Sequence, residues 1–383
     1  MKYFQNFTRR NFLQTSSAGL GLLLTGCIHG PKRTDNKPND EFKTHPIPDR
    51  LLKNAKIVLE VSCRAKAGET LLIVADSVLL PLAPALSAAA HELGLVPSVM
   101  DIREYLISPE YEKGFVYKPL KDAMHAADIV IENLADTWVK NRPDYGRLTG
   151  NPDMQDIALT AERRWVILQP KGMEKWDITA DKVASIRKRT LWLMELLKSA
   201  RTGRITSDNG TDFTFGLGKN SSFSPILGIV PLYGEVAVVP DLTATFGTFI
   251  TDGPTQRDVR PASELHLEPF GIKVEAGRIK EITGGDPVQL ERLRKFIASG
   301  DPAADAIDEV GILTTPFVEN DVYYWSDGTH HHDRVHIALG NNVRRDTLVH
   351  GPQHMDCEVI KPTISIDGLT IIEKGVFLDQ VMD

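Results

Sequence analysis

The spacing of apolar residues changes once along this chain, near residue 200, and the change limits the folds that the chain can adopt. Before it, short apolar runs such as "ETLLIVAD" (69–76) and "DIVIENL" (128–134) alternate with segments of helical spacing. After it, apolar residues alternate at period two, with turns at Asn209-Gly210 and Ala276-Gly277. Strands separated by helices indicate a parallel sheet, whereas period-two hairpins indicate antiparallel sheets. We therefore predict an α/β N-terminal layer with a parallel sheet, followed by a β-rich C-terminal domain.

The first 27 residues have the features of an export signal. Arg9 and Arg10 precede "SSAGLGLLLTGC" (16–27), an apolar run shorter than the roughly 20 residues that a membrane-spanning helix needs. The arginine pair favours the twin-arginine route, which we expect to carry a folded protein. "LTGC" resembles a bacterial lipobox, so we expect Cys27 to be acylated. The alternatives are a chance arginine pair and an ordinary signal-peptidase site.

The composition and charge of the remaining chain predict its domains and exclude nucleic acid as a partner. Residues 28–50 are rich in Pro, Lys, Asp and Asn and predict a flexible tether. We expect an α/β domain over 51–200 and the β-rich domain over 201–383. The net charge of −7 is spread along the chain, and no basic stripe interleaved with aromatic residues argues for nucleic acid. The mature protein is then predicted to be a membrane-anchored lipoprotein facing the periplasm or the cell exterior.

Three local features of the sequence predict cofactor use, the state of the cysteines and one helix. No G-x-G-x-x-G follows the first strand, so a dinucleotide is not indicated. Apart from Cys27, the chain contains only Cys63 and Cys357, which allow one disulfide at most and which we expect to be buried thiols. The helix predicted over 286–300 begins with Asp286 as its N-cap and has Gly300 just past its end.

The candidate metal ligands all lie in the β-rich half. His354 and Asp356 are two residues apart, which on a strand places both side chains on one face. Glu235, Glu309 and His336 each lead into an apolar run, where a buried charge needs a partner. Each also has a plain alternative as a solvent-facing residue at a strand edge. Together they predict that the β-rich domain binds metal.

Five ordered motifs resemble those of the aminopeptidase T type of thermophilic metallopeptidase. "GTDFTFGLG" (210–218) is similar to the family's "GTDLT", and "YGEVAVVP" (233–240) to its "DGEVFTAP". "IDEVGIL" (307–313) is similar to its "LGEVALV", "HIALG" (336–340) is identical, and "HMDCEVI" (354–360) is similar to its "HVDFMIG". The resemblance extends from about residue 51 to residue 383.

The resemblance implies a homodimeric hydrolase that removes N-terminal residues from peptides at a pair of divalent ions such as Zn, Co or Mn. The matching ligand positions are those of the five candidates: Glu235, Glu309, His336, His354 and Asp356. A metal-bridging water attacks the peptide carbonyl in such a site. Glu235 is our first candidate for the residue that carries the proton to the leaving amine.

Three departures from the family affect activity more than metal binding. The family has a tyrosine seven residues after the "HIALG" histidine, where this chain has Val343. The segment between His336 and His354 is also shorter than in the family. In place of an acidic stretch the chain has "HHH" (330–332), of which His330 and His332 either share a face with His336 or belong to an exposed polar turn.

A second family is similar in architecture, the 2,5-dihydroxypyridine dioxygenases. These enzymes use one Fe(II) held by two histidines and one carboxylate, for which His336, His354 and Asp356 are candidates. The family's other histidine corresponds more closely to the position of Glu309. Retention of Glu235 and Glu309 favours two metals. The third alternative is a non-catalytic metal-binding lipoprotein, and only the missing tyrosine supports it.

Overall fold

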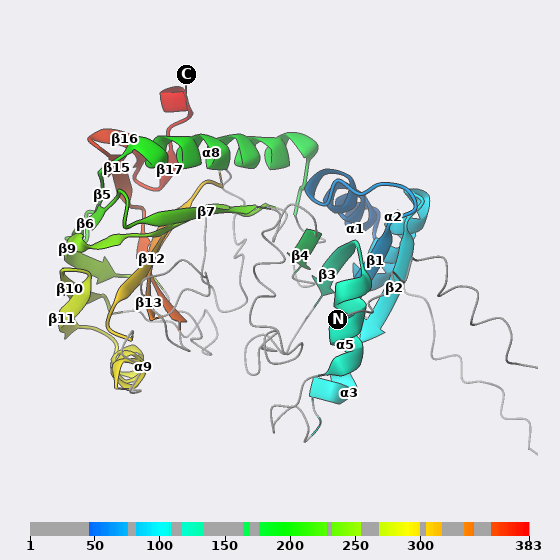
Figure 1. Ribbon diagram of the computed structural model, residues 1–383, viewed down its shortest axis with the longest axis horizontal. Coiled ribbons are helices and arrows are strands. Elements are labelled where there is room, and N and C mark those ends of the chain that lie inside the picture. The colour runs from blue at the N-terminus through cyan, green and yellow to red at the C-terminus, as the bar shows by residue number, and fades with distance from the viewer. Residues whose placement is uncertain are drawn as a thin grey trace, which may run out of the picture. The chain divides into compact units, whose positions relative to one another are not determined.

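Helices and parallel strands alternate in the first part of the molecule. The computed structural model describes residues 46–75, 82–106, 108, 117–133, 164–168, 176–227, 232–253, 268–298, 304–315, 333–340 and 354–382. The predicted signal and Cys27 lie outside these residues, as does most of the predicted tether. The elements of the first part are α1 (Asp49–Ile57), a π-helical turn (Val58–Ser62), β1 (Thr70–Ala75), α2 (Leu82–Glu92), β2 (Val96–Asp101), α3 (Arg103–Leu106), α5 (Lys118–Ala126), β3 (Ile129–Asn133), β4 (Arg164–Leu168) and α8 (Ala180–Ser199) (Figure 1).

The strands of this part form a four-stranded sheet in the order β2-β1-β3-β4. Every neighbouring pair is parallel, which confirms the predicted parallel sheet. Five of the six residues of β1 are buried, as expected of a strand covered on both faces. Since α8 ends at Ser199 and β5 begins at Thr202, the type of element changes where the sequence pattern does. The division into separate domains at that point stays a prediction.

The second part consists mostly of antiparallel strands. Its elements are β5 (Thr202–Thr206), β6 (Asp212–Gly216), β7 (Ser222–Leu227), β8 (Gly234–Val239), β9 (Asp241–Thr251), β10 (Phe270–Glu275), β11 (Arg278–Gly284), α9 (Pro287–Ile297), β12 (Ile307–Leu313), β13 (Arg334–Gly340), β14 (His354–Ile360), β15 (Thr363–Ile366), β16 (Leu369–Glu373), β17 (Val376–Phe377) and a 3-10 helix (Asp379–Met382). The predicted hairpins are β5–β6 and β10–β11, and the latter turns at Ala276-Gly277.

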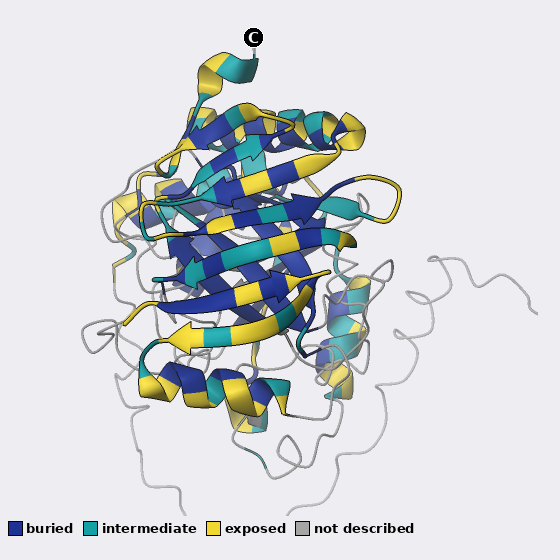
Figure 2. Ribbon diagram, turned by 90° about the vertical axis from the view of Figure 1, so that its left-hand side faces the viewer, coloured by how far each residue is buried: buried dark blue, intermediate teal, exposed yellow. Residues whose placement is uncertain are grey.

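Two sheets result from these strands. An eight-stranded sheet has the order β11-β10-β9-β6-β5-β15-β16-β17, and a five-stranded sheet has the order β14-β13-β12-β8-β7. Figure 2 shows both buried and exposed residues along strands of the eight-stranded sheet, and in β5 the buried and exposed residues alternate. One face of that sheet therefore packs on a core while the other meets solvent.

The central strands of the five-stranded sheet are buried on both faces, and the two faces differ in chemistry. Every residue of β8 and β12 is buried. One face packs into the hydrophobic core together with Phe213, Phe249 and Phe270 of the eight-stranded sheet. That face carries Val236, Val238, Val310, Ile312, Val335, Ile337, Leu339, Met355, Cys357 and Val359. The opposite face carries small residues and ionisable ones, so its chemistry is not that of a hydrophobic core.

Local signals behave as the sequence predicts. The Asp286 carboxylate accepts hydrogen bonds from the backbone amides of Val288 and Gln289, so it caps α9. Gly300 lies outside the described residues. Cys63 and Cys357 are both free thiols and buried, as expected. Among the described helices, none combines the length and the apolar character needed to cross a membrane.

Candidate metal centre

Four neighbouring strands of the five-stranded sheet each supply one ionisable side chain. Glu235 lies on β8, Glu309 on β12, His336 on β13 and Asp356 on β14. We call these four residues the four-strand cluster. Because the strands are adjacent in the order β14-β13-β12-β8, residues that are far apart in sequence meet on one face. The structure therefore brings together four of the five residues that the sequence singles out as ligands.

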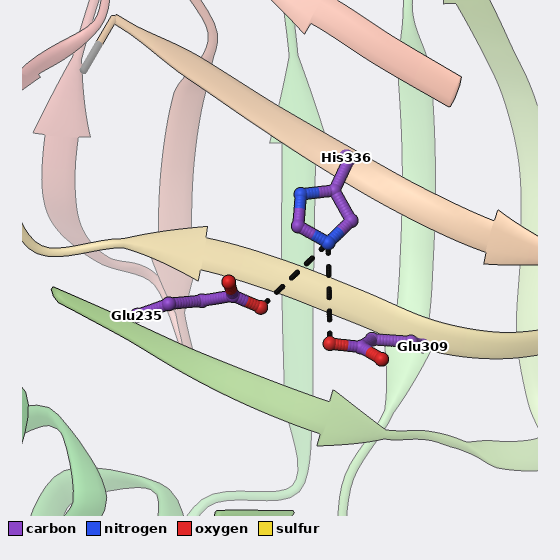
Figure 3. A group of neighbouring side chains, drawn as sticks. All are labelled: Glu235, Glu309 and His336. Atoms are coloured by element: carbon purple, nitrogen blue, oxygen red, sulfur yellow. Dashed lines mark ion pairs between the residues drawn. The ribbon is translucent and has the colours of Figure 1, made fainter. Parts of the chain in front are cut away.

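The cluster converges on one atom, Nε2 of His336. Its distance is 3.6 Å to Oε1 of Glu235, 3.9 Å to Oε1 of Glu309 and 3.9 Å to Oδ1 of Asp356. Figure 3 shows the imidazole pointing between the two glutamates. All four residues are buried, and Glu309, the most exposed, retains only 5% of its accessible surface. Three carboxylates thus share one imidazole away from water.

A β-bulge sets the direction of Glu309. Ile307 pairs with Leu339 on the core face, but Glu309 pairs with Ala338, so Asp308 is an extra residue in β12. In a regular strand Ile307 and Glu309 would point to the same face. The bulge changes this alternation and turns Glu309 towards His336, an arrangement that is frequent next to functional sites. Asp308 itself is fully buried.

Small residues leave room for the cluster. Gly311 lies directly opposite His336 in the register of β12 and β13. A Cβ at Gly311 would lie 2.0 Å from Cε1 and 2.1 Å from Nε2 of His336, and 2.7 Å from Oε1 of Glu235. The imidazole can therefore cross β12 towards β8 only because this residue has no side chain. Ala338 fills the corresponding place between Glu309 and Asp356, since it pairs with both.

Burial and mutual repulsion alter the pKa values of the cluster. Burial raises the pKa of Glu235 to about 8, and the neighbouring Glu309 adds to this while His336 opposes it. Burial alone would lower the pKa of His336, but Asp356, Glu235 and Glu309 together outweigh it and raise that pKa to about 10. In the absence of a cation the cluster therefore retains protons near neutral pH.

Tyr233 adjoins the cluster from the residue that precedes β8. Its phenolic hydroxyl donates a hydrogen bond to Oε2 of Glu235, and its side chain is buried. Burial, followed by the Glu235 carboxylate, raises the pKa of this phenol well above its ordinary value. Tyr233 is therefore a neutral hydrogen-bond donor throughout the physiological range.

The donor set fits divalent cations. Ligand atoms of Glu235, Glu309 and His336 all lie within 4.8 Å of one another. Oε1 of Glu235 is buried and accepts no hydrogen bond from the residues that the structure describes. A buried carboxylate elsewhere on the same sheet is neutralised differently: Glu358 pairs with Arg334 at 2.7 Å. Carboxylate and imidazole donors suit Zn, Co, Mn or Fe(II).

Several predicted site residues cannot be placed. β14 begins at His354, but the side chain of His354 lies outside the described residues. The same holds for the whole of Val343 and of the histidine run 330–332. The shared face of His354 and Asp356 therefore stays a prediction.

Sequence reasoning missed three features of this site. Tyr233 stands beside an apolar run, where a tyrosine is typical of the core. The bulge at Asp308 carries no signal of its own, because only the register of the sheet shows it. Gly311 offers the one sequence signal among the three features, since a glycine in the middle of a predicted strand indicates a bulge or a close approach.

The comparisons with known proteins indicate enzymes. The family model of NicX, 2,5-dihydroxypyridine 5,6-dioxygenase, matches residues 51–379. No curated protein matches the sequence. One similar solved structure is the 2,5-dihydroxypyridine dioxygenase from Pseudomonas putida KT2440, with 17% identity and a TM-score of 0.58, covering 86% of this chain and 97% of that one.

A second similar structure is wild-type AmpT from Thermus thermophilus, with 14% identity and a TM-score of 0.62, covering 86% of this chain and 99% of that one. At these identities the likeness shows the fold alone. The expected relation between the two architectures is confirmed, since this chain is similar to both structures. The resemblance to the aminopeptidase is supported as a fold, whereas the matching family model is that of the dioxygenase.

Proposed function

Because this chain belongs to the family of the 2,5-dihydroxypyridine 5,6-dioxygenases, we propose that it is a metal-dependent enzyme whose centre is the four-strand cluster. The observation that supports this proposal is the convergence of three buried carboxylates on one imidazole nitrogen. Such a concentration of buried negative charge is unfavourable unless cations or protons compensate it. Glu235, Glu309, His336 and Asp356 are the residues that would hold the metal.

The donor set favours hydrolysis as the reaction. One divalent cation would leave one of the three carboxylates uncompensated, whereas two cations with one hydroxide balance them. When bound, a pair of divalent cations lowers the pKa of a coordinated water and polarises a carbonyl group. Function depends on the residues of the site rather than on the fold, so we give this donor set more weight than the family's name. The proposed reaction is cleavage of an N-terminal peptide bond.

The cluster's own residues then have distinct parts in this reaction. Glu309, His336 and Asp356 would bind the metal and fix its position. Glu309 and His336 lie on β12 and β13, which have a neighbouring strand on each side, and Asp356 lies on β14 beside them. Glu235 holds one oxygen towards the cluster and the other against Tyr233. Oε1 of Glu235 lies near Nε2 of His336 but accepts no hydrogen bond from the described residues, so it can accept the proton of water and pass it to the leaving amine.

Ring-opening dioxygenation is the second candidate, and the family match favours it. The comparisons taken by themselves support this reaction better than hydrolysis. It would use His336, His354 and Asp356 around one Fe(II). Glu235 and Glu309 would then be two buried carboxylates outside the ligand set, which is the reason we place this candidate second.

The two reactions are separated by parallel assays on the same preparation. We expect the protein supplied with Zn, Co or Mn to release the N-terminal residue of short free-amine peptides. The Glu235→Gln variant should lose at least about a hundredfold in kcat, the usual scale for removing a ligand or a general acid–base. Oxygen uptake with 2,5-dihydroxypyridine and Fe(II), without peptide hydrolysis, would establish the dioxygenase instead. Unchanged hydrolysis by Glu235→Gln would remove Glu235 from the mechanism.

Export and membrane anchoring remain part of the proposal. The arginine pair and the lipobox predict an acylated Cys27 on a membrane-attached protein outside the cytoplasm. Replacing Cys27 with Ser should move the protein from the membrane fraction to the soluble exported fraction. Membrane association that does not change would contradict acylation at this residue.

The aminopeptidase resemblance also implies a homodimer. Sedimentation of the protein without its signal, residues 1–27, tests this oligomeric state.

A further inference from the structure

Tyr233 is held in place by a group of threonines around the start of β8. The amide of Gly234 donates to Oγ1 of Thr315 at 3.1 Å, and Oγ1 of Thr315 donates to the carbonyl of Leu232 at 3.2 Å. The amide of Thr314 donates to the carbonyl of Gly234 at 2.8 Å. The backbone on both sides of Tyr233 is thus fixed to the end of β12.

Helix α8 holds the same segment from another direction. Oγ1 of Thr190 lies 2.6 Å from Oγ1 of Thr314, and both residues are buried. A Cβ at Gly234 would lie 2.2 Å from Cγ2 of Ile186, so the helix packs directly against the backbone here. These contacts restrain the backbone that carries Tyr233, and they therefore restrict where its phenol lies relative to Glu235.

The hydrogen bond divides the two oxygens of Glu235 between different partners. Oε2 accepts from the Tyr233 hydroxyl, while Oε1 faces Nε2 of His336 at 3.6 Å. A carboxylate free to rotate can bind a cation through both oxygens, but one with a fixed hydrogen bond offers a single oxygen in a fixed direction. Hydrogen-bond partners of this kind orient ligands and typically change metal affinity by 10–100-fold when they are removed.

We propose that Tyr233 is a positioning residue that makes Glu235 a ligand through one oxygen, Oε1. The proposal rests on the metal centre proposed above and adds the coordination that this chain imposes on it. By limiting Glu235 to one oxygen, Tyr233 keeps a coordination position open for water or substrate.

The test compares metal binding in Tyr233→Phe with that in the wild type. We expect Zn affinity, measured by chelator competition, to fall about 10–100-fold. In the cobalt-substituted protein the visible absorption should weaken, because a second oxygen from Glu235 raises the coordination number. Tyr117→Phe removes a phenol on another part of the chain and should leave both measurements unchanged. Urea unfolding of the metal-free proteins shows whether Tyr233→Phe has kept the fold.

A double-mutant cycle separates positioning from general packing. If Tyr233 acts through Glu235, Tyr233→Phe should change Zn affinity less than about twofold in the Glu235→Gln background. Additive losses, or wild-type affinity and cobalt spectrum in Tyr233→Phe, would overturn the positioning role while leaving the metal centre intact. A wild-type protein that binds no Zn, Co, Mn or Fe(II) would overturn the proposed function, and this inference with it.

Discussion

At the scale of single residues, the central feature is that one imidazole nitrogen lies between three buried carboxylates. Nε2 of His336 is within 3.9 Å of an oxygen of each one. Without a cation these groups must keep protons, which the raised pKa values of Glu235 and His336 express. A cation takes over that role, so metal binding should release protons and change how the protein responds to pH.

The metal-free protein should lose stability as the pH rises. The folded-state pKa of Glu235 is raised from 4.5 to about 8, and that of His336 from 6.5 to about 10. Both contributions are fully present below the unfolded-state pKa and are lost as the pH rises through the folded-state pKa. Urea unfolding of chelator-treated protein should therefore give a lower free energy of unfolding at pH 9 than at pH 6, and added Zn should reduce the difference. A free energy of unfolding that stays constant or rises over this range would contradict the raised pKa values of Glu235 and His336.

Gly311 offers a second test at this scale. In Gly311→Ala the new methyl group would lie 2.0 Å from Cε1 of His336 if nothing moved, so the imidazole ring must move. We expect Zn affinity to fall by about tenfold or more. The control is Gly271→Ala, whose methyl would meet Oγ1 of Thr283 at 2.8 Å in the hairpin β10–β11. Equal metal affinity in both variants would show that Gly311 does not determine where the imidazole lies. The similar aminopeptidase motif "LGEVALV" has alanine at the position of Gly311. The experiment therefore also tests whether His336 needs a glycine opposite it in this chain.

Residue chemistry explains which site residues could be predicted. Glu235, Glu309, His336 and Asp356 are conspicuous because a charge that leads into an apolar run must find a partner. Tyr233 is not conspicuous, since its ring is apolar and only its hydroxyl matters. His354 was predicted from its spacing to Asp356, and its side chain lies outside the described residues.

At the scale of elements, local signals predict helices and hairpins well, but pairing between distant strands is not visible in the sequence. The hairpin turn at Ala276-Gly277 and the helix cap at Asp286 are where the sequence predicts them. The pairing of β5 with β15 joins residues more than 150 positions apart. Such contacts depend on which faces are left to be covered once the local elements have formed. The bulge at Asp308 is equally invisible in the sequence, because it is defined by the pairing of β12 with β13.

The cap of α9 gives a stability prediction that is independent of the metal centre. Asp286→Ala removes the acceptor of two amide hydrogen bonds, both 3.0 Å long, and should cost about 1 kcal/mol of unfolding free energy. Asp286→Asn keeps a capping oxygen and should cost much less. Metal content should be the same in both. Loss of metal in Asp286→Ala would mean that α9 is coupled to the four-strand cluster, contrary to our expectation.

At the scale of the whole molecule, the five-stranded sheet joins the core to the site. Its core face packs against the eight-stranded sheet, and its other face carries the four-strand cluster. β9 and β14 connect the two sheets, since the amides of Asp252 and Gly253 both donate to the carbonyl of Glu358. The change of period near residue 200 predicts the parallel sheet and the β-rich part. It does not predict that the strands divide into two sheets, or that one sheet has a polar, buried face.

The metal content of the protein, purified without added metal and measured by elemental analysis, tests whether the four-strand cluster is a metal centre. We expect about two Zn, Co or Mn ions per chain in the wild type. We also expect a marked loss of metal in a variant that lacks both His336 and Asp356, because too few donors remain to hold two cations. About one iron per chain would favour the dioxygenase over the hydrolase. No metal in the wild type, or full metal content in the double variant, would contradict the four-strand cluster as the metal centre.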